Sequence, residues 1–176
     1  MKKSNKITLC AILAALATVV MMAAYFPYVT YSVPAIAGLF IMAALIETDK
    51  KWAFACYLVS VVPIMLFAES EAKFIYICFF GFYPVLKCIL EKIKNNILCF
   101  IVKIICFNGL MAICYLLLKF VTGITFTEAD TTKLILVATV ILFNAVFILY
   151  DILLAKLASE YLVRIHPFVK KILYKK

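Results

Sequence analysis

The sequence predicts an all-α polytopic membrane protein, a bundle of six transmembrane helices that forms one integral membrane domain over residues 1–176. The chain is 68% hydrophobic with a mean hydropathy of +1.13, whereas soluble domains are about 45–50% apolar. So much apolar surface cannot be hidden in the core of a 176-residue globule. In addition, no stretch is polar enough to form a soluble domain of its own.

Long apolar runs separated by short polar or basic segments mark the expected helices. A spanning helix needs about 20 residues at ~1.5 Å rise each. The second and fourth runs are short for a full span, so the count of six depends on them. The expected helices cover residues 7–25, 33–46, 52–68, 73–88, 97–121 and 134–158, followed by a basic cytoplasmic tail over 159–176.

The first run, Ile7–Tyr25, is interpreted as a retained span. It is longer than the usual core of a signal peptide, and the residues after it are not a small-residue cleavage site. In the third run, Pro63 removes a helical hydrogen bond, which predicts a kink near Ser60. The basic, amphipathic segment Lys87–Asn96 is expected to leave the bilayer or to lie along its surface.

The placement of the lysines predicts the orientation in the cell membrane. The formal net charge is +9, but the lysines cluster at the ends of apolar runs, where topology signals lie. With the N-terminus in the cytoplasm, most of the 18 Lys and Arg residues fall inside, and only Lys73 and Lys133 are firmly outside. The sequence therefore predicts a multi-pass protein with both termini cytoplasmic, whose surroundings are the lipid bilayer and not nucleic acid.

Residues suited to catalysis or metal binding are scarce. The only histidine is His166, in the basic tail, and none of the seven cysteines belongs to a CxxC or Cys/His cluster. Hydrolase, metalloprotease and phosphate-loop motifs are missing as well. The sequence thus predicts a protein that is not an enzyme, with no catalytic residue, no metal site and no cofactor.

On the first helix, small side chains recur at spacings of 3, 4 and 3, which places them in one stripe. In lipid, packing drives helix association, so such a stripe allows another helix to approach closely. An ordinary alanine-rich span explains it equally well. The stripe consists of Thr8, Ala11, Ala15 and Thr18.

Polar residues at membrane depth are rare and therefore informative. Asn108 and Asn144 lie about midway along the fifth and sixth helices, where antiparallel packing would bring them to one level. A hydrogen bond between helices is the favoured interpretation, and contact with a ligand is the alternative. Asp151 is expected to pair with Lys103 or Lys156.

Polar and aromatic side chains also gather in the loops on the predicted outer side. A small solute would find stacking surfaces and both signs of charge there, although loops commonly carry such residues. The candidates for binding are Tyr28, Tyr31, Glu69, Glu71, Lys73 and Lys119, together with the two asparagines.

The layout resembles a family, the substrate-binding S components of energy-coupling factor (ECF) vitamin transporters. The similarity lies in the N-terminal lysine cluster and in an alanine-rich first helix with an AxxxA motif, here from Ala11 to Ala15. It implies six helices with cytoplasmic termini, capture of a vitamin or another micronutrient from outside, and docking through helix 1 on a transmembrane coupling subunit. That subunit in turn carries two ATPases.

The alternative is a membrane scaffold of cell-envelope assembly, similar to MreD, in which the spans organise protein partners. A capture protein predicts that Tyr28, Tyr31 and the loop 69–73 converge on one cavity open to the outside. A scaffold needs no such cavity.

Overall fold

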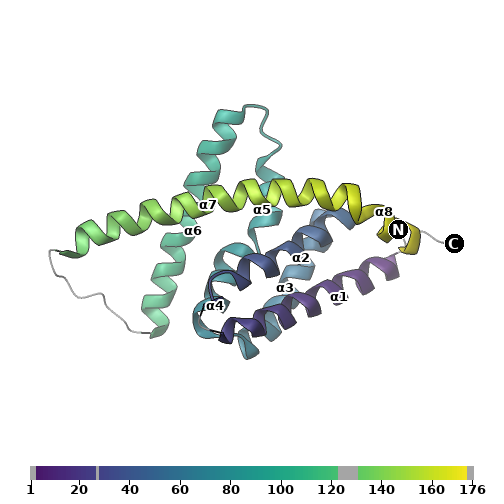
Figure 1. Ribbon diagram of the computed structural model, residues 1–176, viewed down its shortest axis with the longest axis horizontal. Coiled ribbons are helices and arrows are strands. Elements are labelled where there is room, and N and C mark those ends of the chain that lie inside the picture. The colour runs from purple at the N-terminus through teal and green to yellow at the C-terminus, as the bar shows by residue number, and fades with distance from the viewer. Residues whose placement is uncertain (1–2, 27, 123–130, 174–176) are drawn as a thin grey trace.

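The computed structural model describes residues 3–26, 28–122 and 131–173, and every regular element within them is helical (Figure 1). The elements are α1 (Lys3–Met22), a 3-10 turn η1 (Ala23–Tyr25), α2 (Val33–Glu47), α3 (Lys50–Phe67), α4 (Ser70–Ile75), a π-helical segment η2 (Tyr76–Phe80), α5 (Tyr83–Leu90), α6 (Asn96–Thr122), α7 (Thr131–Arg164) and α8 (His166–Leu173). The prediction of an all-α chain is confirmed for this part of the sequence.

Among the described residues, five helical segments are long and apolar enough to cross a membrane. They cover Lys3–Tyr25, Lys50–Phe67, Ser70–Leu90, Ile97–Cys114 and Val140–Arg164. Many large apolar side chains on them are exposed, which a soluble monomer rarely allows. The fold is thus compatible with a helical membrane bundle. The remaining apolar helix, α2, has 15 residues, about 22 Å against a hydrocarbon core of about 30 Å.

Helices α1, α2 and α3 form one packed unit in which α1 and α3 run parallel. Near the start of both, Lys6 of α1 forms an ion pair with Asp49, which precedes α3. At their other end, the Tyr25 hydroxyl donates to the carbonyl of Phe67 at 3.0 Å. Because α2 connects the end of α1 to the start of α3, it runs back antiparallel to both (Figure 1). Alanines on all three helices are buried at their contacts, which lets the backbones approach closely.

The chain next returns along α3 through α4, η2 and α5. Tyr76 and Ser60 share a hydrogen bond of 2.8 Å between their hydroxyls, and the Tyr57 hydroxyl donates to the carbonyl of Ile77 at 2.8 Å. Gly81 follows the π-helical segment, and a Cβ atom there would lie 2.8 Å from the Tyr57 and Tyr76 rings. The expected fourth helix therefore exists, but it is interrupted between η2 and α5. Only a residue without a Cβ atom fits beside the two rings at position 81.

Helix α6 crosses α7 steeply (Figure 1). Aromatic rings from η2, α5, α6 and α7 fill the space around the crossing, among them Phe79, Tyr83 and Tyr150. Phe107 of α6 stacks on Phe147 of α7 with ring centroids 4.4 Å apart. This aromatic cluster fixes the level at which the two helices meet.

Three local features refine the sequence predictions, and one of them, the burial of Lys87, corrects a prediction. Helix α3 is continuous through Pro63 to Phe67, and the kink near Ser60 stays a prediction. Lys87, expected at the membrane surface, is buried within α5 because it has acidic partners there. The tail predicted over 159–176 is helical in its described part, since α7 extends to Arg164 and α8 follows.

Candidate functional site

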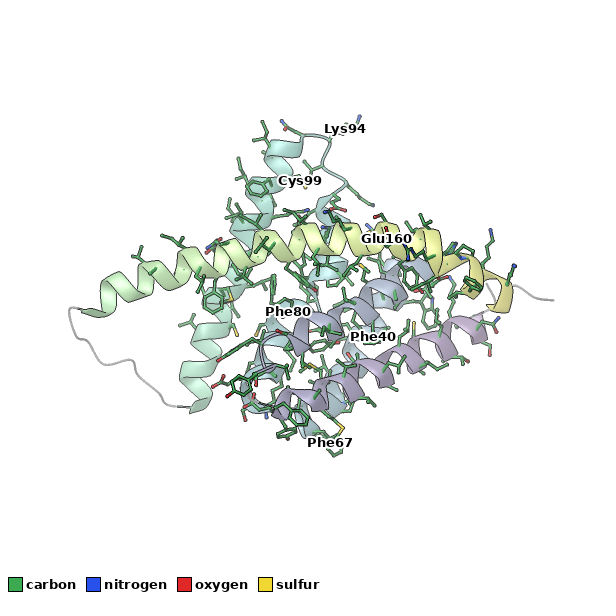
Figure 2. All side chains as sticks on the ribbon, viewed as in Figure 1. Phe40, Phe67, Phe80, Lys94, Cys99 and Glu160 are labelled. Atoms are coloured by element: carbon green, nitrogen blue, oxygen red, sulfur yellow. The ribbon has the colours of Figure 1, made fainter. Side chains whose placement is uncertain are left out.

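The first two loops of the predicted outer side are held together. The Tyr31 hydroxyl donates to the Glu71 carboxylate at 2.8 Å, which ties the segment after α1 to the start of α4. The Tyr25–Phe67 hydrogen bond adds a second link between the same regions. Figure 2 shows Phe67 at this end of the molecule, on the side opposite Lys94. Tyr31 and Glu71 thus meet, whereas the capture hypothesis predicts that Tyr28 and the rest of the loop 69–73 join them around one outward cavity.

Glu69 is used as a helix cap. Its carboxylate accepts hydrogen bonds from the backbone N–H groups of Glu71, at 2.8 Å, and Ala72, at 3.0 Å. A negative charge at this position also interacts favourably with the α4 dipole. The cap holds the backbone of Glu71 in place, and Glu71 in turn holds Tyr31. Glu69 therefore has an indirect role: by capping α4 it fixes the position of Glu71, which binds Tyr31.

The Tyr31–Glu71 hydrogen bond has an electrostatic consequence. Donating to a carboxylate favours the neutral phenol, so the hydrogen bond, together with the negative charge of Glu71, raises the pKa of Tyr31 above its ordinary value. The hydroxyl consequently remains a donor above the pH at which an ordinary tyrosine ionises. A solute with an acceptor group would have to compete with Glu71 for it.

The other predicted outer residues do not join this pair. Tyr28 is 98% exposed, and Lys73 is half-buried on α4. Lys119 lies on α6, but its side chain is outside the described residues. The segment 123–130, which would complete the outer side, is outside them too.

The two asparagines at membrane depth bind each other. Asn108 Nδ2 donates to Asn144 Oδ1 at 2.9 Å, and Asn144 Nδ2 donates to Asn108 Oδ1 at 3.1 Å. Each Nδ2 also donates to a carbonyl one turn back in its own helix, Ile104 or Val140. All four N–H donors are thereby used, so the pair links α6 to α7 and has no donor left for a ligand.

A cluster of charges joins α5, α6 and α7, and it includes the predicted Lys103–Asp151 pair. Asp151 accepts from Lys103 at 3.0 Å, from Lys87 at 2.5 Å and from the Tyr83 hydroxyl at 2.6 Å. Glu91 lies 3.2 Å from Lys103 and 3.5 Å from Lys87. The two lysines are 7% and 8% exposed, and buried charges persist only where they are paired.

We call these five residues, Tyr83, Lys87, Glu91, Lys103 and Asp151, the Asp151 cluster. Its two positive and two negative charges balance, and both lysines have acidic partners. The cluster is therefore suited to holding three helices together. Lys87 was not predicted in this cluster because the segment that begins with it was assigned to the membrane surface. Its position directly after an apolar run was the available signal.

A contact between a histidine and a carboxylate closes the lysine-rich end of the bundle. His166 Nδ1 lies 3.0 Å from Glu47 Oε1, and the Glu47 side chain is only 2% exposed. The contact connects the end of α2 with the start of α8. His166 is the only histidine of the chain, and the sequence placed it in a basic tail. In the structure it contacts Glu47 and so joins two helices.

The small-residue stripe of α1 faces away from the bundle. Thr8, Ala11 and Ala15 are exposed and Thr18 is half-buried, whereas the opposite face of the helix packs on α2 and α3. The hydroxyls of Thr8 and Thr18 donate to carbonyls within α1, at 3.2 and 2.9 Å. The stripe therefore presents a shallow surface without unsatisfied polar groups, on which another helix can pack.

Among the described residues, no group of three or more His, Cys, Asp or Glu side chains is arranged to hold a metal ion. Comparison of the chain with protein-family models, with curated proteins and with solved structures finds no match. Function must therefore be inferred from the residues and contacts of this chain.

Proposed function

We propose that the protein is the membrane-embedded solute-capture subunit of an ECF-type importer. In this proposal it binds a vitamin or another small micronutrient from the outside and has no ATPase of its own. It docks through α1 on a transmembrane coupling subunit, which carries two ATPases. Both termini lie in the cytoplasm, and the chain crosses the membrane six times.

The observation that carries the proposal is the unoccupied small-residue stripe on α1. Thr8, Ala11 and Ala15 are exposed although the helix has ample apolar contacts on its other face. Lipid-facing positions elsewhere on the helix carry large side chains such as Ile12, Leu16 and Val19. The contrast between a smooth stripe and its bulky flanks favours close contact with a partner helix.

Six spans require that α2 crosses the bilayer although it is short. The parallel course of α1 and α3 supports this, because the chain between them has to return to the side on which it began. Lysines at the starts of α1 and α3 collect at one end of this unit, Lys3, Lys6, Lys50 and Lys51. The positive-inside rule assigns that end to the cytoplasm.

The solute would then be captured at the opposite end, where Tyr31 and Glu71 meet. Their hydrogen bond brings a phenol and a carboxylate from two loops into one place. A solute with hydrogen-bond donors suits this pair, because a carboxylate offers several acceptor sites. In the capture hypothesis, the third outer loop, residues 123–130, closes over the solute beside Tyr31 and Glu71.

The scaffold alternative keeps support from two observations. Tyr28 stands apart from Tyr31 and Glu71, and the asparagines at membrane depth are satisfied by each other. Polar groups that pair internally are what a protein needs to organise helices without binding a solute.

Co-purification from the native host distinguishes these hypotheses. The tagged wild-type protein is compared with Ala11→Trp/Ala15→Trp, which covers the stripe, and with Ile12→Trp/Leu16→Trp, which has the same spacing on the neighbouring lipid-facing side. The transporter hypothesis predicts that a coupling subunit and two ATPases accompany the wild type and the control and are lost only from the stripe variant. Recovery of envelope-synthesis proteins without ATPases would refute it and support the scaffold.

A further inference from the structure

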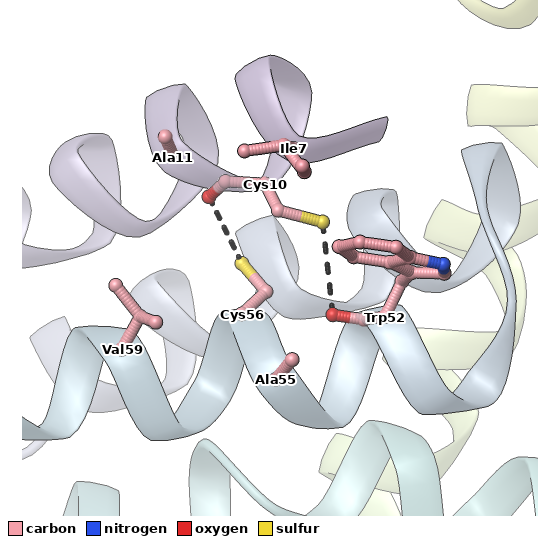
Figure 3. Close-up of a pocket in the computed structure, with 7 residues that line it drawn as sticks. All are labelled: Ile7, Cys10, Ala11, Trp52, Ala55, Cys56 and Val59. Carbon is pink, nitrogen blue, oxygen red and sulfur yellow. Dashed lines mark hydrogen bonds between the residues drawn. The ribbon is translucent and has the colours of Figure 1, made fainter. Parts of the chain in front are cut away.

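A hollow of about 140 Å³ lies between α1 and α3 on the surface of the bundle (Figure 3). Its walls are apolar and include Ile7, Ala55 and Val59. An apolar cavity of about 150 Å³ stays dry and holds a molecule of benzene's size. This hollow therefore has room for a segment of hydrocarbon.

The two thiols at the base of the hollow are both engaged. Cys56 Sγ donates to the carbonyl of Cys10 at 3.3 Å, and Cys10 Sγ donates to the carbonyl of Trp52 at 3.6 Å, as Figure 3 shows. These bonds fasten α1 to α3 and satisfy the polar atoms of the seam. The hollow thus offers hydrocarbon contacts and no polar group that would favour water.

Two lysines stand at one end of the hollow. Lys3 is four residues before Ile7, and Lys51 is four residues before Ala55, so each lies on the same helix face as a lining residue, one turn toward the N-terminus. Because α1 and α3 run parallel, both lysines are at the same end. Both are exposed, and neither forms an ion pair with another described residue. The neighbouring Lys6, in contrast, is paired with Asp49.

Trp52 connects the hollow with this basic rim. Its ring forms part of the wall, and Figure 3 shows the indole nitrogen directed away from the two thiols. Tryptophan is typical of the membrane interface because its ring is apolar and its N–H needs a hydrogen-bond acceptor.

We propose that this groove is a binding site for one anionic phospholipid. Its acyl chain occupies the hollow, and its phosphate lies between Lys3 and Lys51, within reach of the Trp52 N–H. The order of the features argues for a lipid: an apolar slot followed by positive charge matches an acyl chain followed by an anionic headgroup. A partner helix would leave the lysines unmatched. The proposal does not rest on the transport function, since it requires only a bilayer. Ala11 of the small-residue stripe also lines the hollow, so a docked coupling subunit would compete with the lipid.

Native mass spectrometry of the full-length protein in mild detergent tests the site. The protein is titrated with phosphatidylglycerol, which is anionic, and with phosphatidylcholine, which has no net charge. At about fivefold in affinity for each lysine near an anionic headgroup, Lys3→Gln/Lys51→Gln should weaken the first phosphatidylglycerol site about 30-fold. Phosphatidylcholine binding should change little. Ala55→Trp, which fills the hollow, should weaken both lipids.

Lys92→Gln/Lys94→Gln is the matched control, because it removes the same charge from exposed positions in another loop; Figure 2 shows Lys94 far from α1. Elution volume and helical circular dichroism show that each variant is folded. Equal loss in the control would mean unspecific attraction between charges and would overturn the site. Full phosphatidylglycerol binding by a folded Ala55→Trp protein would overturn it as well, since the acyl chain would then lie elsewhere.

Discussion

Replacing Asp151 with leucine removes the common acceptor of the Asp151 cluster. Lys87 and Lys103, both buried, then lose their strongest partner, and the Tyr83 hydroxyl loses its acceptor. Removing one partner of a buried ion pair costs about 3–5 kcal/mol of stability. Glu91 remains 3.2 and 3.5 Å from the two lysines, so we expect the lower end, about 3 kcal/mol.

The variant K87M/K103M/D151L separates the loss of pairing from the loss of packing. It replaces the buried charges by apolar side chains of similar length, which is often neutral or stabilising. Glu91 can be left alone because its side chain is 49% exposed. We therefore expect the variant to recover the cost of the unpaired lysines. It should stay about 1 kcal/mol below the wild type, because the Tyr83 hydroxyl still lacks its acceptor.

Unfolding by sodium dodecyl sulfate in mixed micelles measures both differences, and the single tryptophan, Trp52, supplies the fluorescence signal. The midpoint should fall sharply for D151L and recover in the triple variant. If D151L unfolds at the wild-type midpoint, the lysines are not held by Asp151 as described. If the triple variant is as unstable as D151L, packing and not charge pairing explains the loss.

Two further predictions concern close packing and pH. A Cβ atom at Gly38 would lie 2.5 Å from the carbonyl oxygen of Phe80, whereas at Gly109 it would meet nothing within 4 Å. Gly38→Ala should therefore lower stability by about 1–3 kcal/mol in the same titration. Gly109→Ala should leave stability unchanged or raise it by up to about 1 kcal/mol, because alanine is the better helix former, and equal effects would contradict the packing described. Tyr31→Phe removes an exposed hydrogen bond to Glu71 and should lower stability by at most about 0.5 kcal/mol. Because the pKa of Tyr31 is raised in the folded state, that contribution is complete below the ordinary tyrosine pKa of about 10 and is lost as pH rises through the folded-state value. The melting temperatures of the wild type and of Tyr31→Phe, measured from pH 7 to 11, should accordingly converge only at the alkaline end. A difference that stays constant with pH would show that it does not come from the Tyr31–Glu71 hydrogen bond.

The polar contacts show how far sequence reasoning reaches into a membrane bundle. Asn108 and Asn144 were expected to meet because both lie midway along apolar runs, and Lys103 was expected beside Asp151; the structure contains both contacts. In lipid, a polar side chain at depth has few possible partners, so its position along the run already restricts the choice. Lys87 was missed because its burial depends on acidic groups from other segments.

The sequence by itself determined the all-α class and the approximate course of the apolar helices, because an apolar run of sufficient length has to satisfy its backbone groups internally. It also determined which face of α1 carries only small side chains. The tertiary structure decided that this face is the exposed one and that Tyr31 meets Glu71 while Tyr28 does not. It also decided that a groove lies between α1 and α3, one helical turn from Lys3 and Lys51. Such features depend on the rotation and crossing of helices about one another, and these are set by contacts between residues far apart in the chain.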